Sequence, residues 1–172
     1  MKYILFVCVF LLSKFIYSQT TKKFYVPKKV IDTVKKEFID LQVSSVSNLK
    51  EMDQYIIEGI ISNGNGEIYI SVSLTGETGN IVQASVRISK LDLFKQEDQE
   101  FIEKSTPNIP WKKFLSKLDK KEILAGIAFL SFSDLSGERE FILNTNSKKD
   151  IRPSVLYFDE YANLIRREKL KY

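Results

Sequence analysis

The chain contains no histidine and a single cysteine, Cys8, among its 172 residues. Without histidine, the Ser-His-Asp and Cys-His nucleophilic arrangements are excluded, and so is any zinc site with imidazole ligands. Cys8 lies inside an N-terminal apolar run, directly after Phe6-Val7, whereas a lipid-anchored cysteine ends such a run after a small residue. We therefore expect the rest of the chain to hold no disulfide, no metal ion and no cofactor.

Glycine and proline are also scarce, with 7 glycines and 4 prolines. The densest glycine pattern, Gly64-Asn65-Gly66, lies between two predicted strands. Glycine-rich loops that cradle phosphates lead into a helix instead, so this pattern indicates a hairpin turn and not a nucleotide site. Calcium loops need dense alternating acidic residues with a glycine, and Asp159-Glu160 lacks that pattern.

Two catalytic patterns do not require histidine. The single Ser-x-x-Lys sequence, from Ser47 to Lys50, falls in a loop-like stretch and is in line with chance. Four carboxylates cluster on a predicted connecting helix, namely Glu97, Asp98, Glu100 and Glu103. Nothing apolar surrounds them to favour the protonated form of one, so a solvated acidic face is favoured over a glycosidase pair. We expect no enzyme, with a carboxylate-dependent hydrolase as a remote alternative.

The first 18 residues indicate where the protein works. Met1-Lys2 supplies one positive charge, residues 3–12 are almost entirely apolar, and residues 13–18 are more polar. Ile16 and Ser18 occupy the positions that a signal peptidase reads. The apolar run is too short to remain as a membrane span. Residues 1–18 are predicted to be a secretory signal peptide, with a buried N-terminal helix as the alternative. We expect an exported protein, periplasmic or extracellular, with no membrane span in the mature chain.

The charge balance argues against a nucleic-acid partner. Loss of Lys2 and Lys14 with the signal lowers the 26 basic residues to 24, against 22 acidic residues, which leaves a net charge of +2. Nucleic-acid binders usually carry a much stronger basic excess gathered on one element. The most basic stretch, residues 166–172, alternates in charge sign and is typical of an edge strand protected by charge.

Two segments begin with an apolar residue followed by proline, at Val26-Pro27 and Ile109-Pro110. Proline suits the first position of a helix because its missing N–H would have no partner there. The two prolines are 83 positions apart, and so are Asn80-Ile81-Val82 and Asn163-Leu164-Ile165. A shared spacing at both ends of each half predicts an internal duplication, with two unrelated segments of similar length as the alternative.

Each predicted helix is followed by four strand candidates that favour one half-buried face. The strand candidates are residues 43–50, 54–62, 67–74, 81–88, 127–133, 138–145, 154–159 and 164–170. Residues 92–105 are predicted to be a connecting helix, and a long helix through residues 122–132 competes with the fifth strand. Strands with one buried face predict antiparallel sheets with a helix on one side.

These elements predict an α+β protein of two tandem repeats, each a helix on a four-stranded antiparallel sheet, joined by a helical connector. The expected boundaries are residues 1–18 for the signal peptide, 19–91 for the first repeat, 92–108 for the connector and 109–172 for the second repeat.

The pattern of a helix opened by apolar-proline, a phenylalanine near its end and four short strands resembles the PepSY-like group. It is more closely similar to the tandem beta-lactamase-inhibitor-like proteins of that group. The residues that carry the resemblance are Val26-Pro27, Val30, Phe38, Tyr55, Tyr69, Val72, Gly79, Ile81-Val82, Ile109-Pro110, Phe114, Phe141, Tyr157-Phe158-Asp159 and Leu164-Ile165. The resemblance implies an exported bacterial protein that binds or inhibits another exported protein, without a cofactor.

The clean alternation in residues 67–74 predicts a second face for the first sheet. If Ile68, Ile70, Val72 and Leu74 face the helix, the residues between them face away. The resulting candidate protein-binding face consists of Tyr69, Ser71, Ser73, Gln83, Ser85, Arg87 and, from the second half, Tyr157. Tyrosine, serine and arginine suit protein recognition, although an ordinary solvated sheet face has the same pattern.

The sequence thus predicts an exported, non-catalytic binding or inhibitory module that acts on another envelope or secreted protein. The alternative is a structural or assembly accessory protein of the cell envelope. The identity of the partner and the oligomeric state are not encoded in any pattern of the sequence.

Overall fold

The computed structural model describes residues 25–134 and 137–170. The predicted signal peptide, residues 1–18, lies outside the described residues. Among the described residues, no helix is both long enough and apolar enough to cross a membrane.

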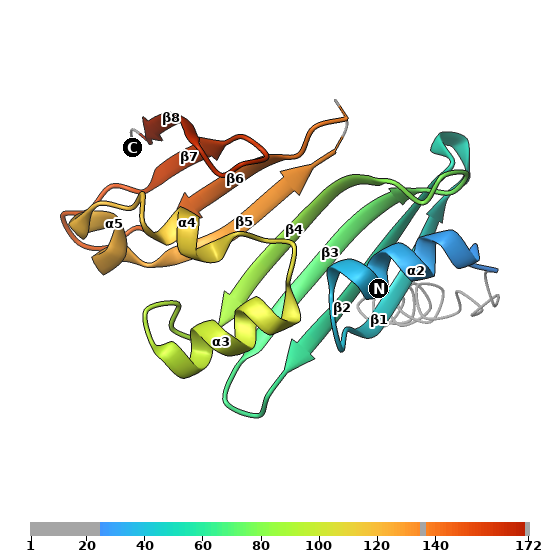
Figure 1. The fold of residues 1–172 in the computed structure, drawn as a ribbon, viewed down its shortest axis with the longest axis horizontal. Coiled ribbons are helices and arrows are strands. Elements are labelled where there is room, and N and C mark those ends of the chain that lie inside the picture. Colours follow the sequence, from blue (N-terminus) through green and yellow to red (C-terminus); the bar gives the residue numbers. More distant parts are fainter. Residues whose placement is uncertain (1–24, 135–136, 171–172) are drawn as a thin grey trace, which may run out of the picture.

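The described residues form an α+β fold with a single eight-stranded antiparallel sheet, in which the strands follow one another in chain order (Figure 1). The elements are α2 (Lys28–Glu37), β1 (Gln42–Leu49), the 3-10 helix η1 (Lys50–Met52), β2 (Gln54–Ser62), β3 (Glu67–Thr75), β4 (Ile81–Ser89), α3 (Gln96–Ser105), α4 (Trp111–Leu115), α5 (Lys120–Ala125), β5 (Ile127–Ser133), β6 (Glu140–Thr145), β7 (Ser154–Phe158) and β8 (Leu164–Lys169). The α+β class and all eight predicted strands are confirmed, with ends displaced by no more than about two residues.

The two expected four-stranded sheets are joined into one. β4 and β5 pair antiparallel over three residue pairs, from Ala84 opposite Phe132 to Val86 opposite Leu130. Hydrogen bonding between β4 and β5 removes two sheet edges that would otherwise be exposed. A helix followed by four strands occurs on both sides of α3 in the chain, whereas the duplication itself stays a prediction.

Both long helices are shorter than the sequence pattern indicates, since the apolar spacing of Val30, Val34, Phe38 and Leu41 predicts a first helix that continues to Leu41. α2 ends at Glu37, because Phe38 is extended and Asp40 takes a positive φ of 61° that turns the chain into β1. α3 begins only at Gln96. Before it, the Asp92 carboxylate accepts a hydrogen bond from the Phe94 N–H at 2.9 Å, which stabilises a turn in place of the helix.

The competition between a long helix and a strand over residues 122–132 is decided at Gly126. α5 ends at Ala125 and β5 begins at Ile127. Gly126 has a φ of 80°, in the left-handed region that glycine adopts without the steric cost of a side chain. This residue ends the helix, and the strand begins at the next one.

α5 begins with a capping box that predicts a pH effect. The Glu122 N–H donates to Asp119 Oδ1, and the Asp119 N–H donates to Glu122 Oε2, both at 2.8 Å. The hydrogen bond from the Glu122 backbone lowers the pKa of Asp119 below its ordinary value. An Asp119→Asn variant keeps a capping oxygen but loses the charge. Because the folded pKa is lowered, the charge stabilises the fold above the ordinary pKa of aspartate.

We therefore expect the wild type to be more stable than Asp119→Asn at neutral pH. The difference should disappear as the pH falls through the folded pKa of Asp119, below about 4. Urea denaturation of both proteins between pH 2.5 and 7 measures this difference, which we expect to be roughly 0.3–1 kcal/mol, the usual contribution of a charge at a helix end. A difference that is independent of pH would contradict the assignment.

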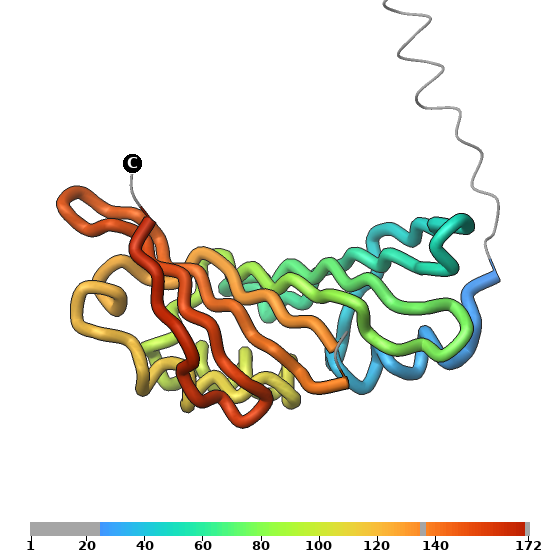
Figure 2. The backbone as a smooth tube through the Cα atoms, turned by 90° about the horizontal axis from the view of Figure 1, so that it is seen from above, coloured from blue at the N-terminus to red at the C-terminus, as the bar shows by residue number. Residues whose placement is uncertain are grey.

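The hydrophobic core lies between one face of the sheet and α2, α3 and α4. The four alternating residues of β3 that the sequence assigns to the helix side, Ile68, Ile70, Val72 and Leu74, are all buried, as predicted. Phe114 of α4 packs on Phe141 and Phe158, with ring centroids 5.0 and 4.7 Å away. Figure 2 shows the sheet edge-on, with α2 and α3 on the same side of it.

One buried position in β4 differs from the sequence pattern. The alternation groups Val82 with Ala84 and Val86, but Ile81 is buried in its place. The consecutive residues Ser73 and Leu74 of β3 pair with Gln83 and Ile81, so β4 contains a β-bulge with Val82 as its extra residue. An extra residue in one strand reverses the alternation beyond it, and no local pattern in β4 reports a bulge in the β3–β4 pair.

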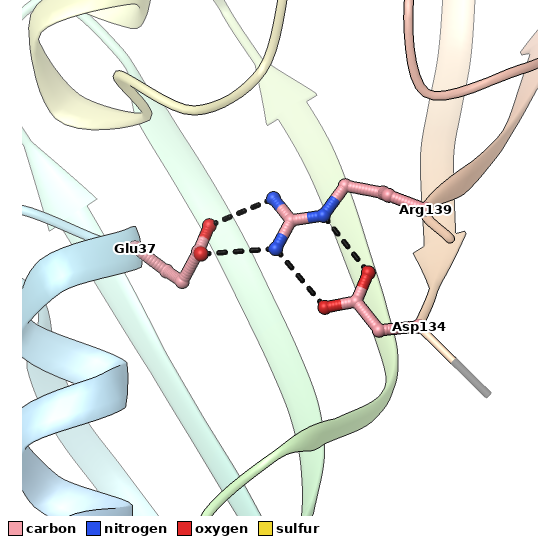
Figure 3. Close-up of polar contacts among 3 residues, drawn as sticks. All are labelled: Glu37, Asp134 and Arg139. Carbon is pink, nitrogen blue, oxygen red and sulfur yellow. Dashed lines mark hydrogen bonds and ion pairs between the residues drawn. The ribbon is translucent and has the colours of Figure 1, made fainter. Parts of the chain in front are cut away.

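A partly buried ion network ties α2 to the start of β6 (Figure 3). The Arg139 guanidinium donates two hydrogen bonds to the Glu37 carboxylate, at 3.1 and 3.0 Å, and two to the Asp134 carboxylate, at 2.9 and 3.0 Å. Although burial opposes the charge, the hydrogen bonds that Arg139 donates to Glu37 and Asp134 raise its pKa further above the ordinary value. The guanidinium also stacks on Phe132, 4.5 Å from the ring centroid.

Candidate protein-binding face

The face of the sheet opposite the core carries a row of residues that crosses every strand. Residues directly opposite each other in adjacent strands share a face, so the strand registers define this row. It runs through Ser45, Glu58, Ser71, Ser85, Ser131, Ile142, Tyr157 and Arg166. Ser71 alternates with the buried Ile70 and Val72, so this face is turned away from α2, α3 and α4. We call it the open face.

The structure brings all seven predicted residues to the open face. On β3 and β4 they form three directly opposed pairs: Tyr69 with Arg87, Ser71 with Ser85, and Ser73 with Gln83. Tyr157 of β7 is in the same row as Ser71 and Ser85, by way of Ser131 and Ile142. The face of Tyr157, which the sequence leaves open, is therefore decided by the register. Whether these residues bind a partner stays a prediction.

Tyr69 is held in place from two sides. The Arg87 guanidinium lies over the Tyr69 ring, 4.7 Å from its centroid. The Tyr69 hydroxyl donates a hydrogen bond to the Glu67 carboxylate, and this bond raises the pKa of Tyr69 above its ordinary value. A ring fixed by a cation on its face and an acceptor at its hydroxyl loses little conformational freedom when a partner contacts it.

A second tyrosine–arginine stack lies on the same face in the C-terminal half. The Arg166 guanidinium is 4.0 Å from the centroid of the Tyr157 ring, and the two residues are directly opposed on β8 and β7. In each set of four strands the tyrosine is on the third strand and the arginine on the fourth. Arg166 is the residue that sequence reasoning missed as part of this face, because the stretch 166–172 was assigned only to edge protection.

A shallow hollow of about 510 Å³ lies between the Tyr69–Arg87 stack and β2. Its lining includes Ser71 and Ser85, whose short side chains leave room, and Glu58. The Glu58 carboxylate accepts a hydrogen bond from Ser45 Oγ at 2.8 Å. A cation on one side and an anion on the other suit a polar side chain of a partner better than an ion of one sign.

Three of the four carboxylates considered for catalysis on the connecting helix have structural partners. The Asp98 carboxylate accepts from the Asp92 N–H at 2.8 Å, Glu100 accepts from Gln96 Nε2 at 3.0 Å, and Glu103 is paired with Lys112 Nζ at 2.9 Å. In the described part of the chain, no three histidine, cysteine, aspartate or glutamate residues gather as a possible metal site.

The Asp159 carboxylate also has a structural contact. It accepts hydrogen bonds from Asn163 Nδ2 at 2.9 Å and from the Asn163 and Tyr161 N–H groups at 2.8 and 3.0 Å. These bonds, the Asn163 side chain first, lower the pKa of Asp159 below its ordinary value. The carboxylate stabilises the turn between β7 and β8, in the manner of an Asx turn.

No family model matches this chain, and no curated protein matches it. Among solved structures, it is similar to a protein of Bacteroides eggerthii provisionally described as periplasmic, with 11% identity and a TM-score of 0.38 over 85% of this chain and 90% of that one. It is also similar to a provisionally described lipoprotein of Clostridium difficile, with 13% identity and a TM-score of 0.30 over 88% of this chain and 98% of that one. Likenesses this low transfer no function to the chain.

Proposed function

We propose that this chain is an exported, non-catalytic binding module that recognises or inhibits another envelope or secreted protein through the open face. The observation that carries the proposal is a sheet face that no described helix covers, bearing two preorganised tyrosine–arginine stacks. Export rests on the signal-peptide pattern of residues 1–18. An inhibitory action rests on the resemblance to the tandem beta-lactamase-inhibitor-like proteins.

The composition of the open face supports protein recognition. Tyrosine and arginine are enriched among the residues that dominate binding energy at interfaces. Two serines of the central row, Ser71 and Ser85, are short and let a partner approach the sheet closely. The two stacks sit at separate strand pairs, so a partner that contacts both must cover several strands, as a specific interface requires.

A pull-down from periplasmic extract tests this function, with the chain expressed from Met1 as bait. We expect one stoichiometric protein partner. Replacing Tyr69 and Tyr157 together by alanine should weaken its binding by a factor of about 30 or more, which corresponds to about 2 kcal/mol at a hot spot. Titration of the recovered partner against each variant measures the loss.

Tyr161→Ala is the matched control, because this tyrosine is exposed and lies in the turn after β7, outside the open face. The control should bind as the wild type does. Capture of several envelope components in variable ratio would favour the structural or accessory role instead. Unchanged binding by the double tyrosine variant would contradict the assignment of the open face.

A further inference from the structure

The two edges of the sheet differ sharply in charge. The edge strand β8 carries four consecutive charged residues, 166–169, as the sequence analysis expects of a protected edge. β1, the opposite edge, has the sequence QVSSVSNL and contains neither a charged residue nor proline. Charged side chains and proline are the usual means by which an edge strand resists pairing with another chain. β8 is therefore protected by charge, whereas β1 lacks charge and proline and has only the bulge between Val43 and Ser45.

An apolar groove of about 560 Å³ runs beside β1 on the helix side. It lies between α2 and β1, and its lining includes Ile31, Phe38, Val43 and Val46. Val43 is 52% exposed, and Ile31 of α2 and Ile39 after it are exposed as well. Within residues 25–134 and 137–170, no strand pairs with the outer edge of β1. Such an edge with apolar side chains next to it fits an added β-strand, which supplies backbone partners to the edge and side chains to the groove.

We propose that the occupant is β1 of a second copy of this chain, paired antiparallel about a two-fold axis so that the two sheets become continuous. Such an interface must be self-complementary, and an uncharged edge meets its own copy without repulsion. Pairing of β1 with β8 of another copy would instead generate a ring or an open filament. The charged β8 edge opposes that arrangement, so association stops at the dimer.

The bulge in β1 restricts the register. The shift between Val43 and Ser45 is held by Ser44 Oγ, which donates to the Glu58 carbonyl at 3.1 Å. Beyond the bulge, Ser45 to Leu49 pair with β2 without interruption. This regular stretch is the part of β1 whose outer edge is straight enough to accept a strand, and the two-fold axis passes through it.

Symmetry then makes a sharp prediction. Opposed residues of antiparallel strands point to the same face, whereas consecutive residues point to opposite faces. In a two-fold pair, a residue of one copy therefore cannot lie opposite the next residue of the other copy. One position of β1 must instead lie opposite the same position in the second copy. A cysteine at that position lies opposite a cysteine of the second copy, within the Cα separation that a disulfide spans.

The first experiment measures the mass of the full chain, expressed from Met1, by sedimentation equilibrium over a range of concentrations. We expect a monomer–dimer equilibrium. The variant with both Val43→Lys and Ser47→Lys should weaken dimerisation about tenfold or more, because each copy then brings two positive charges to the shared edge. Ile165→Lys, at a residue of β8 that is 64% exposed, is the matched control and should leave the dimer unchanged.

The second experiment does not depend on the stability of the lysine variant. Single cysteines replace each residue from Ser45 to Leu49 in turn in a Cys8→Ser background, which contains no other cysteine. We expect rapid disulfide-linked dimer at one position and much slower reaction at its two neighbours. Equal reaction along the stretch, or none, would overturn the proposal.

A monomer at every concentration would also overturn it, as would a filament or a dimer that survives the two lysines. If β1 of a monomer is instead paired with a strand of a different polypeptide, the proposal that a second copy occupies this edge is wrong. The proposal goes beyond the function of the open face, since β1 pairing and the tyrosine stacks involve different residues. A failed dimer test leaves the outcome of the pull-down with Tyr69 and Tyr157 unaffected.

Discussion

Replacing Arg139 by methionine should lower the free energy of unfolding by about 3–5 kcal/mol, the usual cost of leaving one charge of a buried pair without its partner. Glu37 is only 8% exposed, and both its carboxylate oxygens accept from Arg139. Methionine keeps the apolar contact with Phe132 but removes all four hydrogen bonds of the guanidinium. Urea denaturation at neutral pH measures the loss.

Two further variants separate the charge from the packing. Adding Glu37→Gln to Arg139→Met should restore part of the stability, because a neutral amide is cheaper to bury than an unpaired carboxylate. Arg152→Met, at an exposed arginine, should change the stability by no more than about 0.5 kcal/mol. Equal losses for Arg139→Met and Arg152→Met would show that the network contributes nothing.

Replacing Phe114 by alanine should cost about 3–5 kcal/mol as well, by a different mechanism. Phe114 is 0% exposed and contacts Trp111, Phe141 and Phe158, with ring centroids between 4.7 and 6.4 Å away. Truncation removes buried apolar surface and leaves a cavity that the surrounding rings fill only in part. Because α4 has five residues, its attachment to the sheet depends on this contact.

The matched control is Phe94→Ala, at a phenylalanine that is exposed before α3. Its loss should be about 1 kcal/mol or less, since little apolar surface returns to water. Thermal and urea denaturation of both variants measure the difference. A loss from Phe114→Ala as small as that from Phe94→Ala would contradict the packing of α4 on β6 and β7.

Part of the open face follows from local sequence pattern, and part depends on how distant strands pair. The alternation in β3 was sufficient to predict that Tyr69 and Ser71 face away from the core, because the period of two is a local property of a strand. It could not show that Tyr157 shares that face, since this depends on the registers of the four strand pairs from β3 to β7. Arg166 was missed for the same reason, because its partner Tyr157 is defined by register and not by sequence distance.

The amino-acid sequence by itself determined the α+β class, the strand positions and the burial pattern of β3, because hydrophobic period and turn residues act over a few neighbours. Only the tertiary structure decided that the strands form one sheet, that a bulge buries Ile81 in place of Val82, and that Arg139 reaches Glu37 across 102 positions. These features depend on contacts between segments far apart in the chain. They are stabilised by strand pairing and by ion pairs between distant residues, and neither interaction produces a periodic pattern in the sequence.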